Sequence, residues 1–450
     1  MQDTPNHLPD VKNQYEALPY PARDPADEAQ RLILSWLDDL PMINHYCFAG
    51  RQSFGNGFRV LVAGGGTGDG TIFLAEQLRF TDAQIVHLDI SGASLAIAQQ
   101  RATLRKLSNI TFLQDSLLSL PQLGLAPFDY INCSGVLHHL SDPDAGFRAL
   151  RSVLKPDGAI GLMVYASAGR TGVYQMQALM RMVNGAEPDR QRKIANTRDL
   201  LASLPQSNWF KRAEADLYHD HKQDDAGLYD LLLHSQDRAY SVDDLFDWLG
   251  TDASGQGQGH GMHLQFTDVQ RGRAPYLPHM VLAQKPPALL TRMRQLPLRQ
   301  QFAMAELMGG SITTHSLYLT RDATSVAPYG DVETIPFYFH EPLDGATLAQ
   351  VFASNKGQPF VLRHQHSGVA LTVDPGRYGP QILRLIDGKR SFGQIFGQFR
   401  QAWTGNSAPP DDASLFADFA ESYHTLNAIE RLLLRHPDAD TGANQPASRP

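Results

Sequence analysis

A short glycine-rich segment has the composition of a ligand cradle. Residues 64–68 read Gly-Gly-Gly-Thr-Gly, directly after the apolar run 60–63 and before a helix-like stretch at 71–78. Glycines let the backbone approach a ligand closely, and the N-terminus of the following helix presents N–H groups without partners inside the helix. The dinucleotide-binding pattern G-x-G-x-x-G fails in every frame of this loop, which disfavours a nicotinamide-dependent oxidoreductase.

Carboxylates follow the next two predicted strands. Asp89 ends the apolar run 84–89, and Asp115 follows the run 110–114. An acid at the end of the second strand of a βαβ unit is placed to accept hydrogen bonds from ribose hydroxyls. Asp89 could instead begin the next helix, but Ser91 fits that N-cap better. For Asp115 the alternative is an exposed turn residue.

Two adjacent histidines follow the fourth predicted strand, 128–133. His138 and His139 come shortly after Ser134 at the end of this strand. Because histidine titrates near neutral pH, either ring is a candidate general base. The alternative is that the two rings line a pocket or cap the following turn.

The elements that carry these residues alternate along the chain. Residues 155–158 predict a turn and residues 159–165 a fifth strand, so helices separate strands at a regular spacing. This alternation predicts a parallel, doubly wound α/β sheet, in which ligands bind outside the C-terminal ends of the strands. The glycine loop, both carboxylates and the histidine pair all fall on that edge.

This combination resembles the class I S-adenosylmethionine-dependent methyltransferases. The similarity rests on the compact G-x-G-x-G loop, on Asp89, on residues 129–140 and on the Lys-Pro-Asp-Gly turn, and it is near-continuous from 59 to 165. The resemblance implies a Rossmann-like methyltransferase sheet, S-adenosylmethionine as cofactor, and methyl transfer by in-line displacement. The residues that it assigns to the cofactor are Gly64, Gly66, Gly68, Asp89, Asp115, Ser116 and Ser134.

The resemblance also implies individual roles. The family's acid at the position of Asp115 accepts from the exocyclic amine of adenine, and the next backbone N–H, here of Ser116, donates to the ring. The histidine pair falls beside the expected methyl position. Most relatives carry an acid where this chain has Val62, and that acid helps to hold the methionine end of the cofactor. The loss of this acid is expected either to weaken cofactor binding or to pass the task to Asp69 or to the N-terminal segment. A subgroup that includes bacterial lysine methyltransferases shares the apolar residue, so Val62 does not by itself indicate an inactive enzyme.

A chain of 450 residues is expected to hold two or three domains. We predict an N-terminal lid or helical segment at 1–50, a methyltransferase domain at 51–286 with a helical insertion at about 166–235, an accessory C-terminal domain at 287–436 and a disordered tail at 437–450.

The N-terminal segment is rich in tyrosine and proline. It resembles a stretch that folds over the cofactor in a subgroup of these methyltransferases, which makes Tyr15 and Tyr20 candidate lid residues; packing against the core is an equal alternative. Residues 27–39 predict an amphipathic helix, and residues 262–266 and 279–283 predict the strands that close the sheet.

The C-terminal domain is expected to be a small α+β unit. Its pattern predicts a hairpin between 360–363 and 369–373, a helix at 391–403 and a last helix at 413–435. It resembles the winged-helix-like domains attached to some bacterial protein lysine methyltransferases. Residues 342–436 hold nine basic and eight acidic residues, so no phosphate-binding face is visible. We expect this domain to bind a protein partner or to form a homodimer.

Composition narrows the class of protein further. The net charge of −8 disfavours general affinity for nucleic acid or for anionic membranes. Cys47 and Cys133 cannot build a disulfide framework, and no apolar stretch approaches transmembrane length. With no signal peptide at the start, these features predict a cytoplasmic protein.

Two histidine pairs invite a metal-site interpretation. His219 with His221, and His364 with His366, have the spacing of ligands on one strand face. Because no third ligand can be assigned, we interpret both as solvated loops and expect no metal.

The methyl acceptor is left open between two classes. The C-terminal domain favours a protein side chain, and the histidine pair and the insertion favour a small molecule with a hydroxyl, amine or carbon nucleophile. The alternative function is a non-catalytic cofactor-binding or scaffold protein that acts through its C-terminal domain. The intact cofactor motifs argue against that alternative.

Overall fold

The computed structural model describes residues 9–250, 259–268, 271–283, 287–339, 345–354, 358, 360–363, 370–405 and 407–439. The chain forms two compact units, each assembled from separate stretches of sequence. The first comprises Met1–Asp38, Asn56–Asp244 and Gly310–Ser316, and the second comprises Asp39–Gly55, Leu245–Gly309 and Leu317–Pro450.

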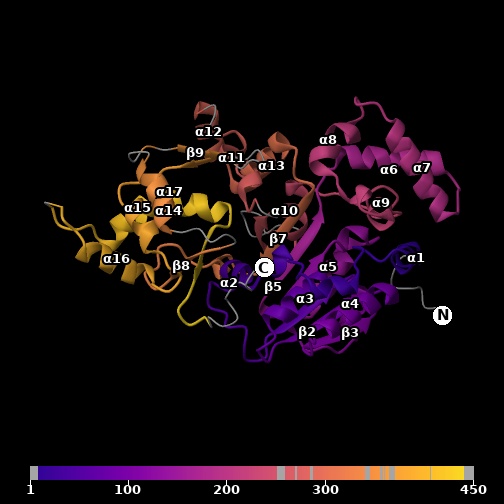
Figure 1. The fold of residues 1–450 in the computed structure, drawn as a ribbon, viewed down its shortest axis with the longest axis horizontal. Helices are drawn as coiled ribbons and strands as arrows, with labels where there is room; N and C mark the ends of the chain where they lie inside the picture. Colours follow the sequence, from indigo (N-terminus) through magenta and orange to yellow (C-terminus); the bar gives the residue numbers. More distant parts are fainter. Residues whose placement is uncertain are drawn as a thin grey trace. The chain divides into compact units, whose positions relative to one another are not determined.

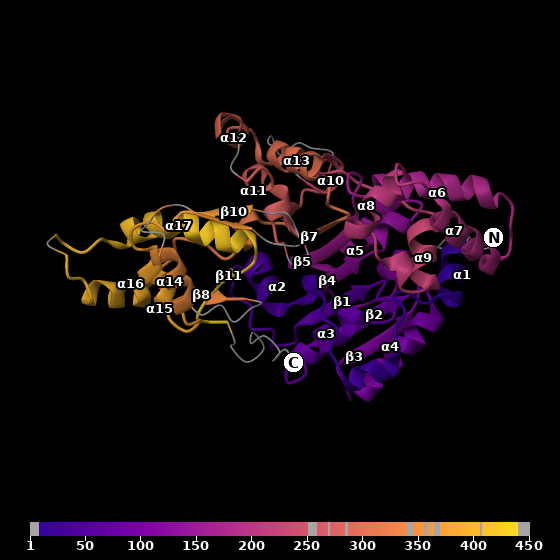
Figure 2. The same cartoon turned by 45° about the horizontal axis from the view of Figure 1, so that its top comes forward.

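The first unit is built on five parallel strands in the order β3-β2-β1-β4-β5 (Figure 2). They belong to a seven-stranded sheet whose other members are β7 (Thr314–Thr320) and β6 (His263–Thr267). This confirms the doubly wound, mostly parallel α/β fold. The five strands are β1 (Arg59–Ala63), β2 (Gln84–Asp89), β3 (Ile110–Gln114), β4 (Phe128–Ser134) and β5 (Leu154–Tyr165).

Helices connect these strands and bury the sheet. The connecting helices are α3 (Asp69–Gln77), α4 (Gly92–Leu104) and α5 (Pro143–Ser152). Because a parallel sheet is covered on both faces, its central strands are buried at nearly every position, as in β1 and β4. Ser91 caps α4 by accepting the N–H of Ser94 at 3.1 Å, which confirms the N-cap prediction and leaves Asp89 outside the cap.

Strand β5 begins earlier than the sequence predicts. Residues 155–158, predicted as a turn, lie within it. Phe128 pairs with Leu154 and Tyr130 pairs with Ala159, so the extra residues form an irregularity inside a continuous strand. The Lys155 ammonium holds this bulge in place by contacting both carboxylate oxygens of Asp129 on β4 at 2.8 Å.

The N-terminal segment does not contain the helix predicted at 27–39. After α1 (Pro9–Ala17) it forms two short 3₁₀ turns, η1 (Pro25–Ala29) and η2 (Trp36–Asp38). Two of its acids are buried and point to different elements of the sheet layer. Glu28 accepts a hydrogen bond from Arg101 on α4, and Asp38 accepts one from Asn132 on β4. These contacts replace the internal bonds of a continuous helix.

The insertion after β5 forms a small helical subdomain. Its helices α6, α7, α8 and α9 gather together in both cartoon views (Figures 1 and 2). Their buried faces share an apolar cluster that includes Val173, Leu201, Phe210 and Leu231. The bounds are α6 (Thr171–Asn184), α7 (Arg190–Ser203), α8 (Trp209–Leu217), the turn η5 (Asp220–Lys222) and α9 (Asp225–Leu232).

The second unit is mixed α+β. Its strand at 263–267 matches the prediction for 262–266, whereas the strand predicted at 279–283 is wrong. That segment holds the short helix α11 (Pro278–Val281), for which Pro278 supplies a preset φ at the first position. The remaining helices and short turns before β8 are α2 (Leu40–Cys47), α10 (Val242–Leu249), η6 (Ala274–Tyr276), α12 (Pro287–Arg294), α13 (Leu298–Gly309) and η7 (Ala323–Ser325).

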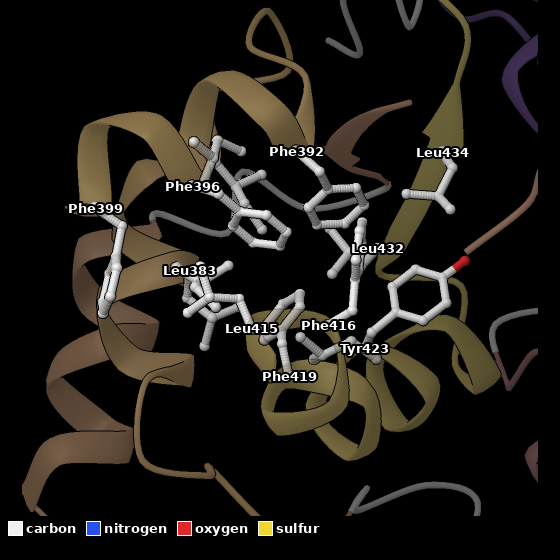
Figure 3. Packing of buried hydrophobic residues seen from close by; sticks show 14 of the residues in the cluster. Leu383, Phe392, Phe396, Phe399, Leu415, Phe416, Phe419, Tyr423, Leu432 and Leu434 are labelled. Atoms are coloured by element: carbon white, nitrogen blue, oxygen red, sulfur yellow. The ribbon is translucent and has the colours of Figure 1, made fainter. Parts of the chain in front are cut away.

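The C-terminal part of this unit packs around an aromatic core (Figure 3). Phe392, Phe396 and Phe399 lie on one face of α16 and meet Phe416 and Phe419 of α17. The elements are β8 (Ile335–Tyr338), α14 (Gly345–Ser354), β9 (Phe360–Arg363), β10 (Ala370–Val373), α15 (Gly379–Leu385), α16 (Phe392–Gln401), α17 (Asp412–Ala428) and β11 (Leu432–Arg435).

Two predictions for this region are confirmed and one is wrong. The helix at 391–403 is present with a capping box at Ser391, and β9 pairs with β10 as the expected antiparallel hairpin. The last helix does not reach residue 435. Glu430 adopts a φ of 56°, which reverses the chain, and β11 then pairs antiparallel with β8.

Two further expectations concern residues outside those that the structure describes. His364 and His366 lie outside them, as does the tail from residue 440 onward. Among the residues that are described, no helix combines the length and the apolar character needed to cross a membrane.

Candidate active site

A cavity of about 760 Å³ lies in the first unit, along the C-terminal ends of its strands. This volume is within the range of small-molecule sites, roughly 300–1,000 Å³. The wall contains six of the seven residues assigned to the cofactor by the sequence, whereas Gly68 lies at the N-cap of α3 instead. The six are Gly64, Gly66, Asp89, Asp115, Ser116 and Ser134.

The glycine loop forms one side of the cavity. Gly66 has a φ of +53°, and a Cβ at this position would lie 2.8 Å from the carbonyl oxygen of Tyr20. A larger residue would therefore be strained and would also press on the N-terminal segment. The N–H of Gly66 donates to Asp89 Oδ2 at 2.8 Å, which ties the loop to the end of β2.

The two predicted acids differ in their surroundings. Asp89 is buried and accepts from the N–H groups of Gly66 and Ser91, and burial nevertheless raises its pKa. Asp115 Oδ1 accepts the N–H of Ser116 at 2.7 Å, so that N–H is engaged within its own loop. Both carboxylates line the same cavity, as their positions at the strand ends predict.

Two acids come near the position left apolar by Val62. The Asp69 carboxylate is occupied by the guanidinium groups of Arg23 and Arg101, which hold its pKa below the usual range against the effect of burial. Asp38 also lines the cavity, and its side chain is hydrogen-bonded to the neutral groups of Asn132 and Ser35. Burial raises the pKa of Asp38 to about 6.

The histidine pair is divided by the cavity wall. His139 lines the cavity, whereas His138 is fully buried behind it and stacks on Tyr165 with ring centres 3.9 Å apart. His139 Nδ1 lies 2.8 Å from the carbonyl of Gln236, so Nδ1 donates and Nε2 is left as an acceptor toward His138 Nε2 at 3.1 Å. Burial lowers the pKa of both rings, which keeps them neutral at pH 7.

A group of side chains that the sequence did not bring together completes the cavity; Tyr15, Tyr20 and His139 were candidates, whereas the others were missed. We call it the tyrosine chamber. Its centre is Asp230 on α9, whose Oδ1 accepts from the Tyr15 hydroxyl at 3.0 Å and whose Oδ2 accepts from the Tyr165 hydroxyl at 2.9 Å. The members are Tyr15, Tyr20, His139, Tyr165, Arg170, Tyr218, Asp220 and Asp230.

Helix α1 joins the glycine-loop side to the tyrosine chamber. The carbonyl of Tyr15 accepts from Ser91 Oγ at 3.1 Å, and the Glu16 carboxylate accepts the N–H of Gly92 at 2.8 Å, both at the start of α4. The hydroxyl of the same Tyr15 reaches Asp230. The interpretation of Tyr15 and Tyr20 as lid candidates gains the observation that both line the cavity.

Two chamber residues, His139 and Asp230, and the neighbouring His234 have ligand atoms close enough for a metal ion. Their hydrogen bonds disfavour this use. Both oxygens of Asp230 accept from tyrosines, and His234 Nδ1 accepts the N–H of Gln236 at 3.1 Å. Nε2 of neutral His234 therefore carries the proton and has no lone pair for a metal. His219 and His221, which the sequence suggested to be a solvated loop, are not part of this group. His221 Nε2 instead lies within hydrogen-bond distance of Glu214 Oε1, at 2.8 Å.

Comparison with known proteins agrees with this geometry. Residues 55–211 match a family model described as a methyltransferase domain. An uncharacterised protein of Synechococcus sp. is 32% identical over 310 residues, covering 68% of this chain and 70% of that protein. A ubiquinone biosynthesis O-methyltransferase of Albidiferax ferrireducens is 30% identical over 135 residues, covering 30% of this chain and 47% of the enzyme.

Solved structures show the same fold over most of the chain. The structure of PKMT2 from Rickettsia typhi superposes with a TM-score of 0.56 at 14% identity, covering 89% of this chain and 76% of that one. The same protein in complex with AdoHcy gives a TM-score of 0.54. The chain belongs to the class I S-adenosylmethionine-dependent methyltransferases. It is an enzyme that uses S-adenosylmethionine as its methyl donor.

Proposed function

We propose that this enzyme methylates an amine nitrogen held in the tyrosine chamber. The observation that carries the proposal is the buried carboxylate of Asp230, which stands among tyrosine rings in the wall of the cavity that also contains the cofactor residues. A carboxylate favours a nearby cation, and the faces of aromatic rings do the same. The chamber therefore suits an ammonium group before transfer and a methylated ammonium group after it.

The cofactor side fits the family's donor. S-adenosylmethionine, when bound, supplies a methyl group on a sulfonium that is displaced in line by the acceptor. We propose that Asp89 accepts the ribose hydroxyls, that Asp115 and Ser116 hold the adenine, and that Asp38 receives the ammonium of the methionine end in place of an acid at Val62. These four residues, and Val62 itself, line the cavity.

The chain's own residues prepare the acceptor. Tyr15 and Tyr165 fix the orientation of Asp230 through their hydroxyls, so its charge is held in one place. An ammonium must lose a proton before its nitrogen can attack. His139 lines the chamber and is neutral because burial lowers its pKa, so we propose that its Nε2 accepts this proton once the hydrogen bond from His138 to that nitrogen is broken.

A second candidate is O-methylation of a hydroxyl. The specific observation in its favour is the same neutral His139, because a hydroxyl also needs a base, and O-methyltransferases are among the relatives.

Both an amine of a protein side chain and an amine of a small molecule fit the primary proposal. The enclosed position of Asp230 adds weight to a small acceptor.

The test compares acceptors and variants with a labelled methyl donor. We expect transfer to amines, and Asp230→Asn should reduce it at least about 100-fold while S-adenosylhomocysteine binds with unchanged affinity. Asp225→Asn, at an exposed position of the same helix, is the matched control and should keep wild-type transfer. Transfer only to hydroxyls, abolished by His139→Gln but not by Asp230→Asn, would replace the first proposal with the second.

We also propose that the protein works in the cytoplasm. Its two cysteines, Cys47 and Cys133, are free and buried, which is compatible with a reducing compartment. Cell fractionation would test this, and recovery in an oxidising compartment would contradict it. Partner binding or homodimer formation through the C-terminal domain stays a prediction, to be measured by analytical ultracentrifugation of the full chain.

A further inference from the structure

Arg170 is a buried cation with unused hydrogen-bond donors. It lines the tyrosine chamber at the N-cap of α6, and only 4% of its surface is exposed. Its Nε and Nη2 have no hydrogen-bond partner among the described residues. The ion pair that it makes, with Asp237, is long at 3.6 Å. The guanidinium also has a side-chain hydrogen bond with Tyr174, which leaves Nε and Nη2 as the donors without partners. Buried donors of a charged group that lack partners are unfavourable, so they are normally matched by a ligand or a partner.

Asp237 is not free to satisfy these donors. Its Oδ1 accepts from the Tyr174 hydroxyl at 3.3 Å and its Oδ2 accepts from Gln177 Nε2 at 2.9 Å. Both partners lie on α6, so they orient the carboxylate and keep it at its distance from Arg170. The Asp237 charge therefore offsets that of the guanidinium without occupying its N–H groups.

The backbone around Arg170 is held firmly. The N–H of Gly169 donates to Ile312 at 3.0 Å, and the carbonyl of Gly169 accepts from the Tyr218 hydroxyl at 2.7 Å. A Cβ on Gly169 would lie 2.1 Å from the Ile312 carbonyl oxygen, so the two segments are in close contact. The guanidinium lies 3.6 Å from the centre of the Tyr165 ring. Arg170 is thus preorganised at the cavity wall.

We infer that Arg170 binds a carboxylate of the methyl acceptor, which makes the acceptor a small molecule of the amino-acid class. This rests on the proposed function, in which Asp230 faces the amine. Tyr165 contacts both residues, through its ring to Arg170 and through its hydroxyl to Asp230, so the two charges are within the span of one small molecule. The planar guanidinium presents paired donors that match a carboxylate.

The charge of the chamber favours a carboxylate over a phosphate. Asp220 and Asp230 line the same cavity as Arg170, and Asp237 pairs with its guanidinium. A doubly charged anion would therefore be repelled more strongly than a singly charged one. The amino and carboxylate groups of a zwitterion match Asp230 and Arg170 with no net charge added. An amine on a protein side chain brings no such carboxylate.

The test uses acceptor pairs that differ only in the carboxylate. Proteinogenic amino acids and their decarboxylated amines are titrated calorimetrically into the protein saturated with S-adenosylhomocysteine, with inorganic phosphate as a competing anion. We expect at least one acid to bind roughly tenfold to a hundredfold more tightly than its amine, as one charge-assisted pair provides. Arg170→Gln should remove that preference and leave affinity for S-adenosylhomocysteine unchanged.

Two further variants keep the result interpretable. Arg170→Lys retains the charge beside Asp237 and should keep a reduced preference, even if Arg170→Gln does not fold. Arg192→Gln, an exposed arginine of the same insertion, is the matched control and should behave as the wild type.

The outcomes separate this inference from the proposed function. Equal binding of acids and amines, no binding of any acid, or displacement of the acid by equimolar phosphate would overturn the carboxylate site. Amines methylated with no effect of Arg170→Gln would leave the proposed function standing and remove this inference. Acids that bind through Arg170 but are never methylated would leave the carboxylate site standing and remove the proposed function.

Discussion

The contact between the glycine loop and strand β2 can be tested with one methyl group. A Cβ added at Gly65 would lie 2.4 Å from Cε1 and 2.5 Å from Nδ1 of His87. The His87 ring cannot move aside, because it is fully buried, its Nδ1 is 2.8 Å from Thr71 Oγ1, and Phe112 packs beside it. In Gly65→Ala the loop must therefore lift away from β2.

The expected size follows from the cost of overpacking. One extra methylene in a well-packed site costs typically about 1–3 kcal/mol. If the loop takes this strain, the affinity for S-adenosylhomocysteine should fall by roughly 10- to 100-fold, since about 1.4 kcal/mol corresponds to a tenfold change. Isothermal titration calorimetry of the purified variant measures this directly.

The double variant Gly65→Ala/His87→Ala distinguishes this clash from a general loss of flexibility. Removing the ring opens the space that the methyl group needs, so the double variant should bind more tightly than Gly65→Ala alone. Gly397→Ala is the matched control, because a Cβ there meets nothing within 4 Å, and it should leave the affinity unchanged. Wild-type affinity in Gly65→Ala, or no gain in the double variant, would refute the reasoning.

Three other predictions concern buried charges. Glu28→Gln removes the carboxylate that the buried Arg101 contacts at 2.7 Å, and urea denaturation should show a loss of about 3 kcal/mol. Asp38→Asn should raise the melting temperature of the cofactor-free enzyme at pH 7. A carboxyl pKa raised to about 6 lowers the free energy of unfolding by about 3 kcal/mol above that pH and by nothing below pH 3.8. The same variant should bind S-adenosylhomocysteine more weakly, and unchanged affinity would contradict the proposed role. Burial lowers the pKa of His234 to about 4, so its contribution to the free energy of unfolding is full above pH 6.5 and is lost, by about 3 kcal/mol, as the pH falls to 4. The denaturation midpoint of His234→Asn should therefore depend less on pH between 6.5 and 4.

The parallel sheet and the cofactor side could be predicted because their signals are local. Strand β2 is an apolar run that ends in Asp89, and the next polar residue, Ser91, has the side chain of an N-cap. In a parallel sheet all such strand ends meet on one edge, so listing the polar residues that follow each strand was enough to assemble the wall. The glycine loop needed no tertiary information beyond its place between a strand and a helix.

The tyrosine chamber could not be found in this way. Asp230 lies on an insertion helix, and nothing in the pattern around it says that this face turns toward Tyr15, more than two hundred residues earlier in the chain. Arg170 could be read only as a polar residue before a helix. The segment 27–39 was misjudged for the same reason, because Glu28 and Asp38 follow partners on other elements rather than helical periodicity.

The double attachment of Tyr15 has a kinetic consequence. Its backbone is anchored where the cofactor's ribose is expected and its hydroxyl orients Asp230, so whatever orders α1 on one side also prepares the other. Donor and acceptor should then raise each other's affinity by the same factor, as thermodynamic reciprocity requires. In steady-state kinetics, the apparent KM of each substrate should fall as the concentration of the other is raised.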